Sequence, residues 1–291
     1  MKDYVILLRP KQWVNNLLVF CPAFFSNNLL SEGVLLWSVV IFVSFCFLSS
    51  SIYCFNDIKD AEHDRLHPIK KLRPISSGKL SVKRGYLMMV SSLLLSLVIP
   101  LTVDMPGRAM LYVILLVYYI LNISYCMKLK HIAIIDVITI SMGYVLRVFA
   151  GGVIGIWISQ WIVLMTFLLA LFLSLYKRRT DIVFLESTDM GTSQSLYGYN
   201  LTFINYSLAI ILSITLVCYI MYTVSDEVIY RMGSSYLYLT TLWVLIAIFR
   251  ILQRALVHVS TDTPVQLLYK DYLILICLFG WISSFAAIIY F

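Results

Sequence analysis

The sequence predicts an all-α, polytopic membrane protein with nine transmembrane helices. Of its 291 residues, 61% are hydrophobic and 13% are charged, and the mean hydropathy is +0.89. Soluble globular domains are far more polar than this. Long apolar runs recur along the whole chain, and a helix needs ~20 such residues to cross a hydrocarbon core of ~30 Å. Residues 1–291 are therefore expected to form a single transmembrane domain.

The apolar runs and the charged connections between them follow one another in order. The first run comes after a short polar leader, the second ends at a cluster of carboxylates, and the sixth ends at three adjacent cations. The fifth contains an aspartate and an arginine. The expected spans cover residues 14–31, 34–55, 84–102, 109–126, 133–155, 159–176, 202–223, 235–252 and 272–290. Connections that carry motifs fall at about 56–83, 127–132, 177–200 and 253–271.

Basic residues predict the orientation. The chain has 22 Lys and Arg against 15 Asp and Glu, a net charge of +7. With a cytoplasmic amino terminus, 19 of the 22 fall on the cytoplasmic side, whereas Arg108 and Arg231 fall outside and Arg147 lies in a span. Lys and Arg concentrate in the cytoplasmic loops of membrane proteins. We therefore expect a multi-pass protein of the cell membrane whose acidic cluster faces the cytoplasm.

The acidic cluster at the end of the second run is the first candidate site. Asn56, Asp57, Asp60 and Asp64 come three, four, seven and eleven residues after Tyr53. A continuous helix would therefore place all five side chains on one face. Like charges placed in this way repel unless a cation lies between them. Oxygen ligands with room for water and phosphate suit Mg²⁺ better than zinc or copper. The cluster therefore predicts a Mg²⁺ site, with a solvated acidic helix end as the alternative.

Basic residues follow the acidic cluster in the same connection. They are Arg65, Lys70, Lys71, Arg73 and Lys79. An acidic group that holds Mg²⁺, followed by cations, suits a diphosphate, because the metal takes some oxygens and Lys or Arg takes the others. Attraction of a basic loop to anionic lipid is the alternative. That alternative leaves the regularly spaced carboxylates unexplained.

Further cations lie at the cytoplasmic ends of the fourth and sixth runs. Lys128 and Lys130 follow the fourth run, and Lys177, Arg178 and Arg179 close the sixth. Three adjacent cations cannot all face one way on a helix. We expect one or two to reach toward lipid headgroups and another to turn toward the bundle interior. A purely topological role is the alternative for each group.

Two ionisable residues lie within the fifth run. Asp136 is near its cytoplasmic end, and Arg147 is about three turns deeper on the same face. Charged groups in a membrane span are costly and usually face a cavity or each other. The small residues Gly143, Ala150, Gly151 and Gly152 would permit close helix packing nearby. We expect Arg147 to face a cavity.

Taken together, these motifs resemble those of a known family. Asn56-Asp57-x-x-Asp60-x-x-x-Asp64 is similar to the first aspartate-rich motif of the UbiA superfamily of intramembrane prenyltransferases. Other blocks, spread over most of the chain and in family order, look like the decaprenyl-phosphate phosphoribosyltransferase branch. They are Arg9-Pro10-Lys11-Gln12-Trp13-Val14, Arg65-x-His67-Pro68-x-Lys70-x-x-Arg73-Pro74-Ile75, Leu129-Lys130-His131, Arg147-x-x-Ala150-Gly151-Gly152 and Lys177-Arg178.

The resemblance implies a UbiA-like bundle of nine helices with a central cavity that opens to the cytoplasm. It implies Mg²⁺-dependent transfer of the 5-phosphoribosyl group from 5-phosphoribosyl 1-diphosphate to a polyprenyl, decaprenyl-like phosphate. Diphosphate would be released, and the product would be a cell wall polysaccharide precursor, as in arabinan biosynthesis. Prenyl-transferring relatives carry a second aspartate-rich motif where this chain has Lys177 to Asp181. Lys and Arg can hold a monophosphate directly.

The resemblance also assigns roles to residues. Catalysis is expected from Asp57, Asp60 and Asp64, and Mg²⁺ ligation from these three together with Asn56. The family commonly has Lys at the position of Asn15, which offers a hydrogen bond without a charge, and Lys11 would compensate in part. The lipid phosphate already carries a nucleophilic oxygen, so catalysis would depend on positioning and charge neutralisation. Residues expected to bind the substrates are Lys11, Asn15, Tyr53, Lys70, Arg73, Lys128, Lys130, Arg147, Lys177 and Arg178.

Two other functions stay open. Transfer of a prenyl group from a prenyl diphosphate to an aromatic or other small acceptor would share the fold and Mg²⁺. A clear second aspartate-rich motif would favour it, and Asp181 and Glu186 supply that motif poorly. A transporter would use Arg147 and Asp136 to line a permeation path, but no inverted repeat is evident and the acidic cluster would lack a purpose. The length of the lipid, the pathway and association of the chain into a homo-oligomer are left open by the sequence.

Overall fold

A computed structural model describes residues 2–26, 28–66, 70–187, 198–257 and 270–290. Within these ranges the regular structure is helical. In the described part of the chain, seven helices are long and apolar enough to cross a membrane, and Tyr272–Ile288 is a shorter apolar helix. The all-α membrane class is thereby confirmed. The chain forms two compact units, Met1–Lys130 with Met142–Ser159, and His131–Ser141 with Gln160–Phe291.

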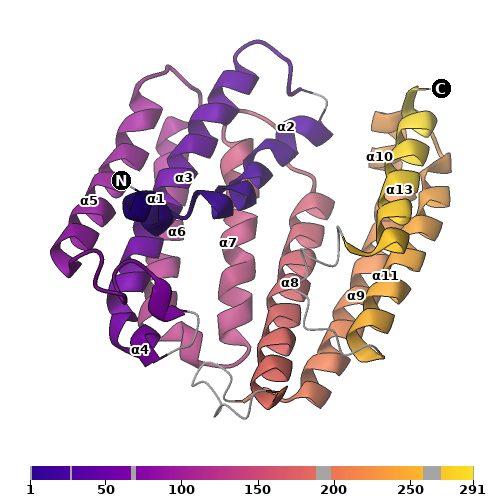
Figure 1. Ribbon diagram of the computed structural model, residues 1–291. Coiled ribbons are helices and arrows are strands. Elements are labelled where there is room, and N and C mark those ends of the chain that lie inside the picture. Colours follow the sequence, from indigo (N-terminus) through magenta and orange to yellow (C-terminus); the bar gives the residue numbers. More distant parts are fainter. Residues whose placement is uncertain (1, 27, 67–69, 188–197, 258–269, 291) are drawn as a thin grey trace. The chain divides into compact units, whose positions relative to one another are not determined.

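The first unit is built around one long helix, α3 (Val34–Lys59), beside which α5 and α6 pack (Figure 1). Before α3 come α1 (Lys2–Leu8), the 3-10 helix η1 (Pro10–Phe20) and α2 (Cys21–Phe25). After it come α4 (Ala61–Leu66), η2 (Lys70–Leu72), α5 (Val82–Val98), η3 (Ile99–Leu101), α6 (Arg108–Met127) and η4 (Leu129–His131). The helix α7 (Ile135–Gly152) contributes residues to both units.

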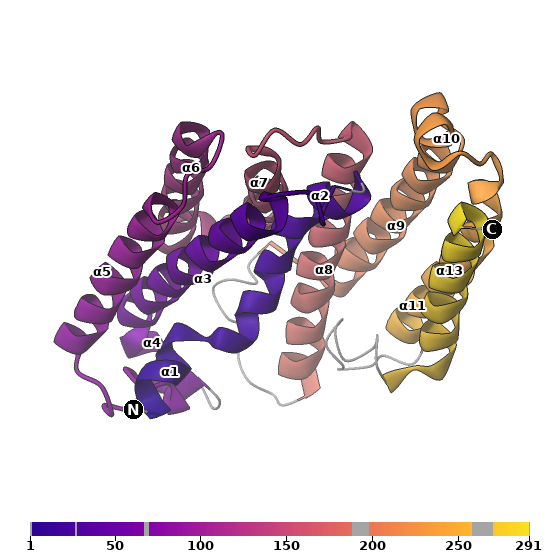
Figure 2. The same ribbon diagram turned by 90° about the horizontal axis from the view of Figure 1, so that it is seen from above.

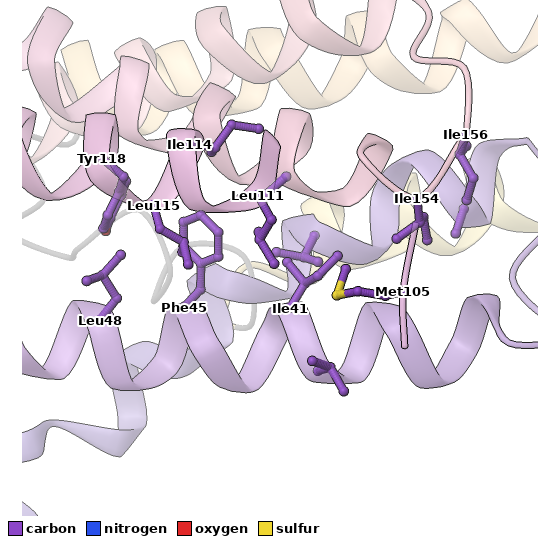
Figure 3. Packing of buried hydrophobic residues seen from close by; sticks show 14 of the residues in the cluster. Ile41, Phe45, Leu48, Met105, Leu111, Ile114, Leu115, Tyr118, Ile154 and Ile156 are labelled. Atoms are coloured by element: carbon purple, nitrogen blue, oxygen red, sulfur yellow. The ribbon is translucent and has the colours of Figure 1, made fainter. Parts of the chain in front are cut away.

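The core of the first unit lies between α3 and α6. Figure 3 shows Ile41, Phe45 and Leu48 of α3 meeting Leu111 and other residues of α6. Lipid tails are as apolar as these side chains, so close packing holds such helices together more than exclusion from water does. Buried serines on α3, at 38, 44, 49, 50 and 51, add little bulk and let neighbouring segments approach closely.

Those serines also anchor the amino-terminal segment. The Ser50 hydroxyl donates to the carbonyl of Leu8 at 2.8 Å and accepts from the Trp13 indole at 3.0 Å. The Asn16 amide donates to Ser49 at 3.3 Å. These contacts place η1 along α3, with its first residue close to the end of α3 that carries the aspartates.

The second unit contains the carboxyl-terminal helices. They are α8 (Gln160–Ser187), α9 (Leu201–Thr223), α10 (Asp226–Met232), η6 (Tyr236–Thr240), α11 (Thr241–Leu256) and α13 (Tyr272–Tyr290). In Figure 2, α8 lies beside α9, and α11 lies beside α13. The side chain of Asn200 accepts from the Phe203 amide and caps α9.

The predicted count of nine transmembrane helices is wrong in one respect, because the span expected at 14–31 is not a single α-helix. Its first part is η1, and a 3-10 helix of 11 residues is unusually long. At ~2.0 Å per residue η1 rises ~22 Å, and α2 adds ~7 Å. The two together are about as long as the hydrocarbon core is thick. Pro10 and Pro22 stand at the starts of these two pieces.

Two predicted connections also differ from the structure. The sixth span was expected to end at residue 176, but α8 continues to Ser187, so Lys177 and Arg178 lie on a helix. The connection at 56–83 begins with the last turn of α3 and contains α4 and η2. Parts of three predicted connections, residues 67–69, 188–197 and 258–269, lie outside the described residues, and the side chain of Glu186 does too.

Candidate functional site

The acidic motif lies where α3 ends in the first unit. The single helix expected to carry all its members is interrupted at Asp60, which caps α3, and α4 begins at the next residue. The Asp64 amide donates to the Asp60 carbonyl at 2.8 Å, so the chain keeps its helical direction across the break. Asp57 and Asp64 are buried, while the side chain of Asp60 is 26% exposed. Asp60 is therefore the most accessible carboxylate of the motif.

Each carboxylate of the motif is paired with a basic side chain. One nitrogen of Arg73 bridges two of them, at 3.1 Å from Asp57 Oδ1 and 2.6 Å from Asp64 Oδ2. Arg9 donates to Asp57, and Lys130 donates to Asp60. Three negative charges thus face three positive charges. The repulsion expected between the aspartates is thus relieved, in this structure, by basic side chains of the protein itself.

The donor chemistry of the motif suits Mg²⁺. Asn56, Asp57, Asp60 and Asp64 offer only oxygen as a metal ligand, as a hard divalent cation requires. Among the described residues, the basic partners bind one oxygen of each carboxylate and leave the other without a partner. No three His, Cys, Asp or Glu side chains of the described part already converge as a metal-binding group. Ligation by these residues therefore requires the basic side chains to shift.

Arg9 is a site residue that the sequence analysis did not select. Its guanidinium lies 5.0 Å from the centre of the Tyr53 ring and pairs with Asp57. Its backbone is left-handed, with φ 52 and ψ 57, a conformation that few residues other than glycine adopt. The requirement that three close carboxylates be neutralised was a signal that could have pointed to Arg9, the nearest arginine upstream in the sequence.

Arg147 is buried, as its place within a span suggested, and its nitrogens are bound by protein groups. Nε donates to Asn16 at 2.7 Å, Nη1 to the carbonyl of Gly143 at 2.8 Å, and Nη2 to the hydroxyl of Tyr118 at 2.6 Å. The rings of Tyr118 and Tyr144 flank the guanidinium at 4.9 and 5.1 Å. Among the described residues of the first unit no carboxylate pairs with it. Its predicted role as a substrate contact stays a prediction.

The other substrate residues predicted in the first unit are more exposed. Lys11 and Asn15 lie on η1, Lys70 begins η2, and Lys128 caps α6. Within the described residues, the side chains of Lys11, Asn15 and Lys128 make neither an ion pair nor a hydrogen bond. We refer to Arg9, Arg73 and Lys130, together with the three aspartates that they bind, as the ionic cluster. Lys11, Asn15 and Lys128 are not part of the ionic cluster.

The second unit has a basic site of its own near the start of α7. Asp136 Oδ2 accepts from Nε and Nη2 of Arg178, each at 2.9 Å, and Oδ1 accepts from the Tyr199 hydroxyl at 2.5 Å. Burial, and then the bond to Asp136, raises the pKa of the Tyr199 hydroxyl, which keeps its proton and remains a donor. Tyr199 carried no motif and was missed in the sequence analysis.

The three adjacent cations of α8 do turn in different directions, as expected. Lys177 is exposed, Arg178 pairs with Asp136, and Arg179 is 2% exposed. Arg179 Nε donates to Asn205 at 2.9 Å, and another of its nitrogens donates to the carbonyl of Ala255 at the end of α11. Arg179 thus joins α8, α9 and α11, and a cation suits the carbonyl end of α11.

These features define a class: a polytopic helical membrane protein in which carboxylates and cations meet at helix ends. The UbiA prenyltransferase family matches residues 18–263, and the chain belongs to that family. Decaprenyl-phosphate phosphoribosyltransferase of Corynebacterium glutamicum is 38% identical over 202 residues, which cover 68% of this chain and 60% of that protein. The chain thus spans about three fifths of that relative.

Two further comparisons cover nearly the whole chain. Decaprenyl-phosphate phosphoribosyltransferase of Mycolicibacterium smegmatis is 30% identical over 98% of this chain and 91% of that protein. A UbiA homologue from Archaeoglobus fulgidus, solved with DMAPP and Mg²⁺ bound, has a TM-score of 0.70 and 23% identity, with 99% of each chain covered. The structural likeness supports the fold, and the sequence likeness identifies relatives in the phosphoribosyltransferase branch.

Proposed function

We propose that this protein transfers the 5-phosphoribosyl group from 5-phosphoribosyl 1-diphosphate to a polyprenyl phosphate in the cell membrane and releases diphosphate. Two relatives at 30% and 38% identity are named decaprenyl-phosphate phosphoribosyltransferase. The expected cytoplasmic position of the acidic motif suits a water-soluble phosphorylated donor. A decaprenyl-like lipid is the acceptor that those names favour.

The ionic cluster is the observation that carries this proposal. It combines carboxylates that suit a divalent cation with arginine and lysine that suit phosphate oxygens. Asn56 and Asp60 are the proposed metal ligands, with Asp57 and Asp64 completing or orienting the set. Bound there, Mg²⁺ would supply charge neutralisation for the diphosphate leaving group. Arg9, Arg73 and Lys130, once displaced from the aspartates, would bind the oxygens of the same group.

The reaction needs no strong general base, because the lipid phosphate enters with an ionised oxygen. This oxygen forms a bond with the anomeric carbon of the ribose while the bond from that carbon to the diphosphate breaks. The residues have to align the two substrates and stabilise the charge that develops on the diphosphate. We assign the second task to Lys130 and Arg73, and their contacts with carboxylate oxygens of the motif support this assignment.

The test is transfer by the purified protein of label from phosphoribosyl diphosphate to polyprenyl phosphates of several lengths, with Mg²⁺ and with EDTA. Lipid-linked label that EDTA abolishes is the expected result. An inactive wild-type protein with every lipid length would contradict the proposal. The same preparation supplied with a prenyl diphosphate and an aromatic acceptor tests prenyl transfer, and product in that arm alone would assign the alternative function.

A further inference from the structure

Two arginines share one carboxylate near the end of α11, within the second unit. Arg250 and Arg254 are one helical turn apart, so their side chains project from the same face of α11. Arg250 Nε lies 3.2 Å from Oδ1 and 3.0 Å from Oδ2 of Asp271, and Arg254 Nε lies 3.3 Å from Oδ2. Like charges at this spacing repel each other. A single carboxylate offsets one of the two, so one positive charge of the group is left over.

Asp271 is already heavily used. It is buried at the start of α13, where its Oδ1 accepts from the amides of Leu273 at 3.1 Å and Ile274 at 3.4 Å. The carboxylate therefore caps α13 as well as facing two guanidinium groups. Its contact with Arg254 has the distance of an ion pair but lacks a hydrogen bond from Nε. Within the described ranges, no other carboxylate forms an ion pair with Arg250 or Arg254.

The terminal nitrogens of the two arginines provide donors for an anion. Arg250 Nη1 donates to Gln253 at 2.8 Å. Among the residues that the structure describes, Arg250 Nη2 and both terminal nitrogens of Arg254 make no hydrogen bond. The side chains of Arg250 and Arg254 are 19% and 26% exposed, so a ligand can reach them. Guanidinium groups match the geometry of phosphate oxygens.

Apolar side chains are exposed on the same two helices. Phe249 and Val257 lie exposed at the end of α11, and Tyr272 lies exposed at the start of α13. A lipid suits this combination, because its tails cover apolar surface while its headgroup binds cations. The distribution of basic residues predicts that this end of α11 lies at the cytoplasmic surface, where anionic headgroups concentrate.

We propose that Arg250 and Arg254 form a binding site for the headgroup phosphate of an anionic membrane phospholipid. The inference is independent of the proposed function. Phosphatidylglycerol carries a phosphate and no cation, so it fits the positive charge that Asp271 leaves over. Phosphatidylcholine carries the same phosphate with a choline cation, which that charge repels. Free phosphate lacks the tails that would cover the exposed apolar side chains.

Native mass spectrometry of the purified protein in detergent measures lipid binding without turnover. Phosphatidylglycerol is expected to bind at least about fivefold more tightly than phosphatidylcholine. Arg254→Gln should weaken the binding of phosphatidylglycerol by about 5- to 20-fold, as loss of a charge-assisted hydrogen bond does. Arg84→Gln, exposed on α5, makes the same change of charge and is the matched control. It should leave the affinity unchanged.

Asp271→Asn separates lipid binding from a structural role of the ion pairs. The amide keeps an oxygen that can cap α13 but removes the competing negative charge, so phosphatidylglycerol should bind more tightly than in the wild type. This prediction stands by itself if Arg254→Gln fails to fold. Unchanged or weaker binding in Asp271→Asn would mean that the ion pairs only support the fold, and it would overturn the proposal.

Other ligands supply the remaining outcomes. Inorganic phosphate that displaces phosphatidylglycerol at an equal concentration would assign a free anion to the site. A short-chain polyprenyl phosphate that binds more tightly than phosphatidylglycerol, and depends on Arg254, would assign the site to that lipid. Either result would overturn the proposal of a phospholipid site, as would equal losses of affinity in Arg254→Gln and Arg84→Gln.

Discussion

Lys128 and Lys130 stand two residues apart in the same short basic stretch, yet their surroundings differ. Lys130 donates to Asp60, whereas Lys128 is exposed at the end of α6. The motif alone could not separate them, because both are basic residues after the same apolar run. The difference lies in their elements: Lys128 caps α6, whereas Lys130 belongs to η4 and pairs with Asp60.

Replacing these two lysines tests the assignment. Lys130→Met is expected to lower transfer by about 10- to 100-fold, since a lost charge-assisted hydrogen bond costs about 1.5–3 kcal/mol. Lys128→Met, the matched control, should stay within about threefold of the wild type by the same scale. Initial rates with both substrates in excess measure this. Equal losses in the two variants would mean that both lysines act at the site, or that neither acts through Asp60.

Metal binding by the aspartates is expected to depend on diphosphate. Arg9, Arg73 and Lys130 neutralise the carboxylates, so Mg²⁺ alone has to displace cations that then lack a partner. With diphosphate present, those cations gain new partners. Titration calorimetry should therefore show Mg²⁺ binding at least about tenfold tighter with diphosphate than without it.

The variant Arg9→Gln removes one of the competing cations. It should bind Mg²⁺ alone more tightly than the wild type does, while Arg65→Gln, exposed on α4, should not. Mg²⁺ affinities that are identical with and without diphosphate would contradict this account of the ionic cluster. The test is independent of turnover, so it stands whatever the second substrate is.

At the scale of elements, η1 differs most from the sequence prediction. Its apolar run has the composition of a membrane helix, but the structure forms a 3-10 helix over Pro10–Phe20. Side chains of this 3-10 helix make hydrogen bonds to other elements. Asn16 accepts from Arg147 of α7, and Trp13 donates to Ser50 of α3. Such long-range contacts override local helix preference and cannot be read from an apolar run.

Neighbouring asparagines on η1 allow a matched test of this role. Asn16→Leu leaves Arg147 with an unsatisfied buried donor and should lower the free energy of unfolding by about 1–3 kcal/mol. Asn15→Leu, one position earlier and half-buried, should change it by less than about 0.5 kcal/mol. Thermal unfolding in detergent measures both. If Asn15→Leu is instead the less stable variant, the pairing of Asn16 with Arg147 is not what holds η1 in place.

At the scale of the whole molecule, the asymmetry of basic residues predicts which ends of the spans meet the cytoplasm. Ser77, exposed in the connection before α5, should lie on the cytoplasmic side, and Asp226, exposed at the start of α10, on the opposite side. Five native cysteines are buried and Cys21 is partly exposed, so the wild type provides a low background for thiol labelling.

Cysteine labelling checks this orientation. Ser77→Cys should react with an impermeant maleimide only in inside-out vesicles, and Asp226→Cys only in right-side-out vesicles. The wild type in each preparation controls for Cys21. Labelling of both variants from one side would contradict the predicted orientation and, with it, the cytoplasmic position of the acidic motif.

Composition and the length of the apolar runs determined the all-helical membrane class, because a lipid environment admits few other folds for such a chain. The spacing of Asn56, Asp57, Asp60 and Asp64 likewise predicts a site with oxygen ligands, and that site stays a prediction. Tertiary structure alone decided which side chains bind these carboxylates. Asp57 pairs with Arg9 rather than Lys11, and Asp60 pairs with Lys130 rather than Lys128. Asp136 accepts from Tyr199, which belongs to no motif. Ion pairs and hydrogen bonds require atoms within about 3 Å, and only the packing of segments far apart in sequence brings those atoms together.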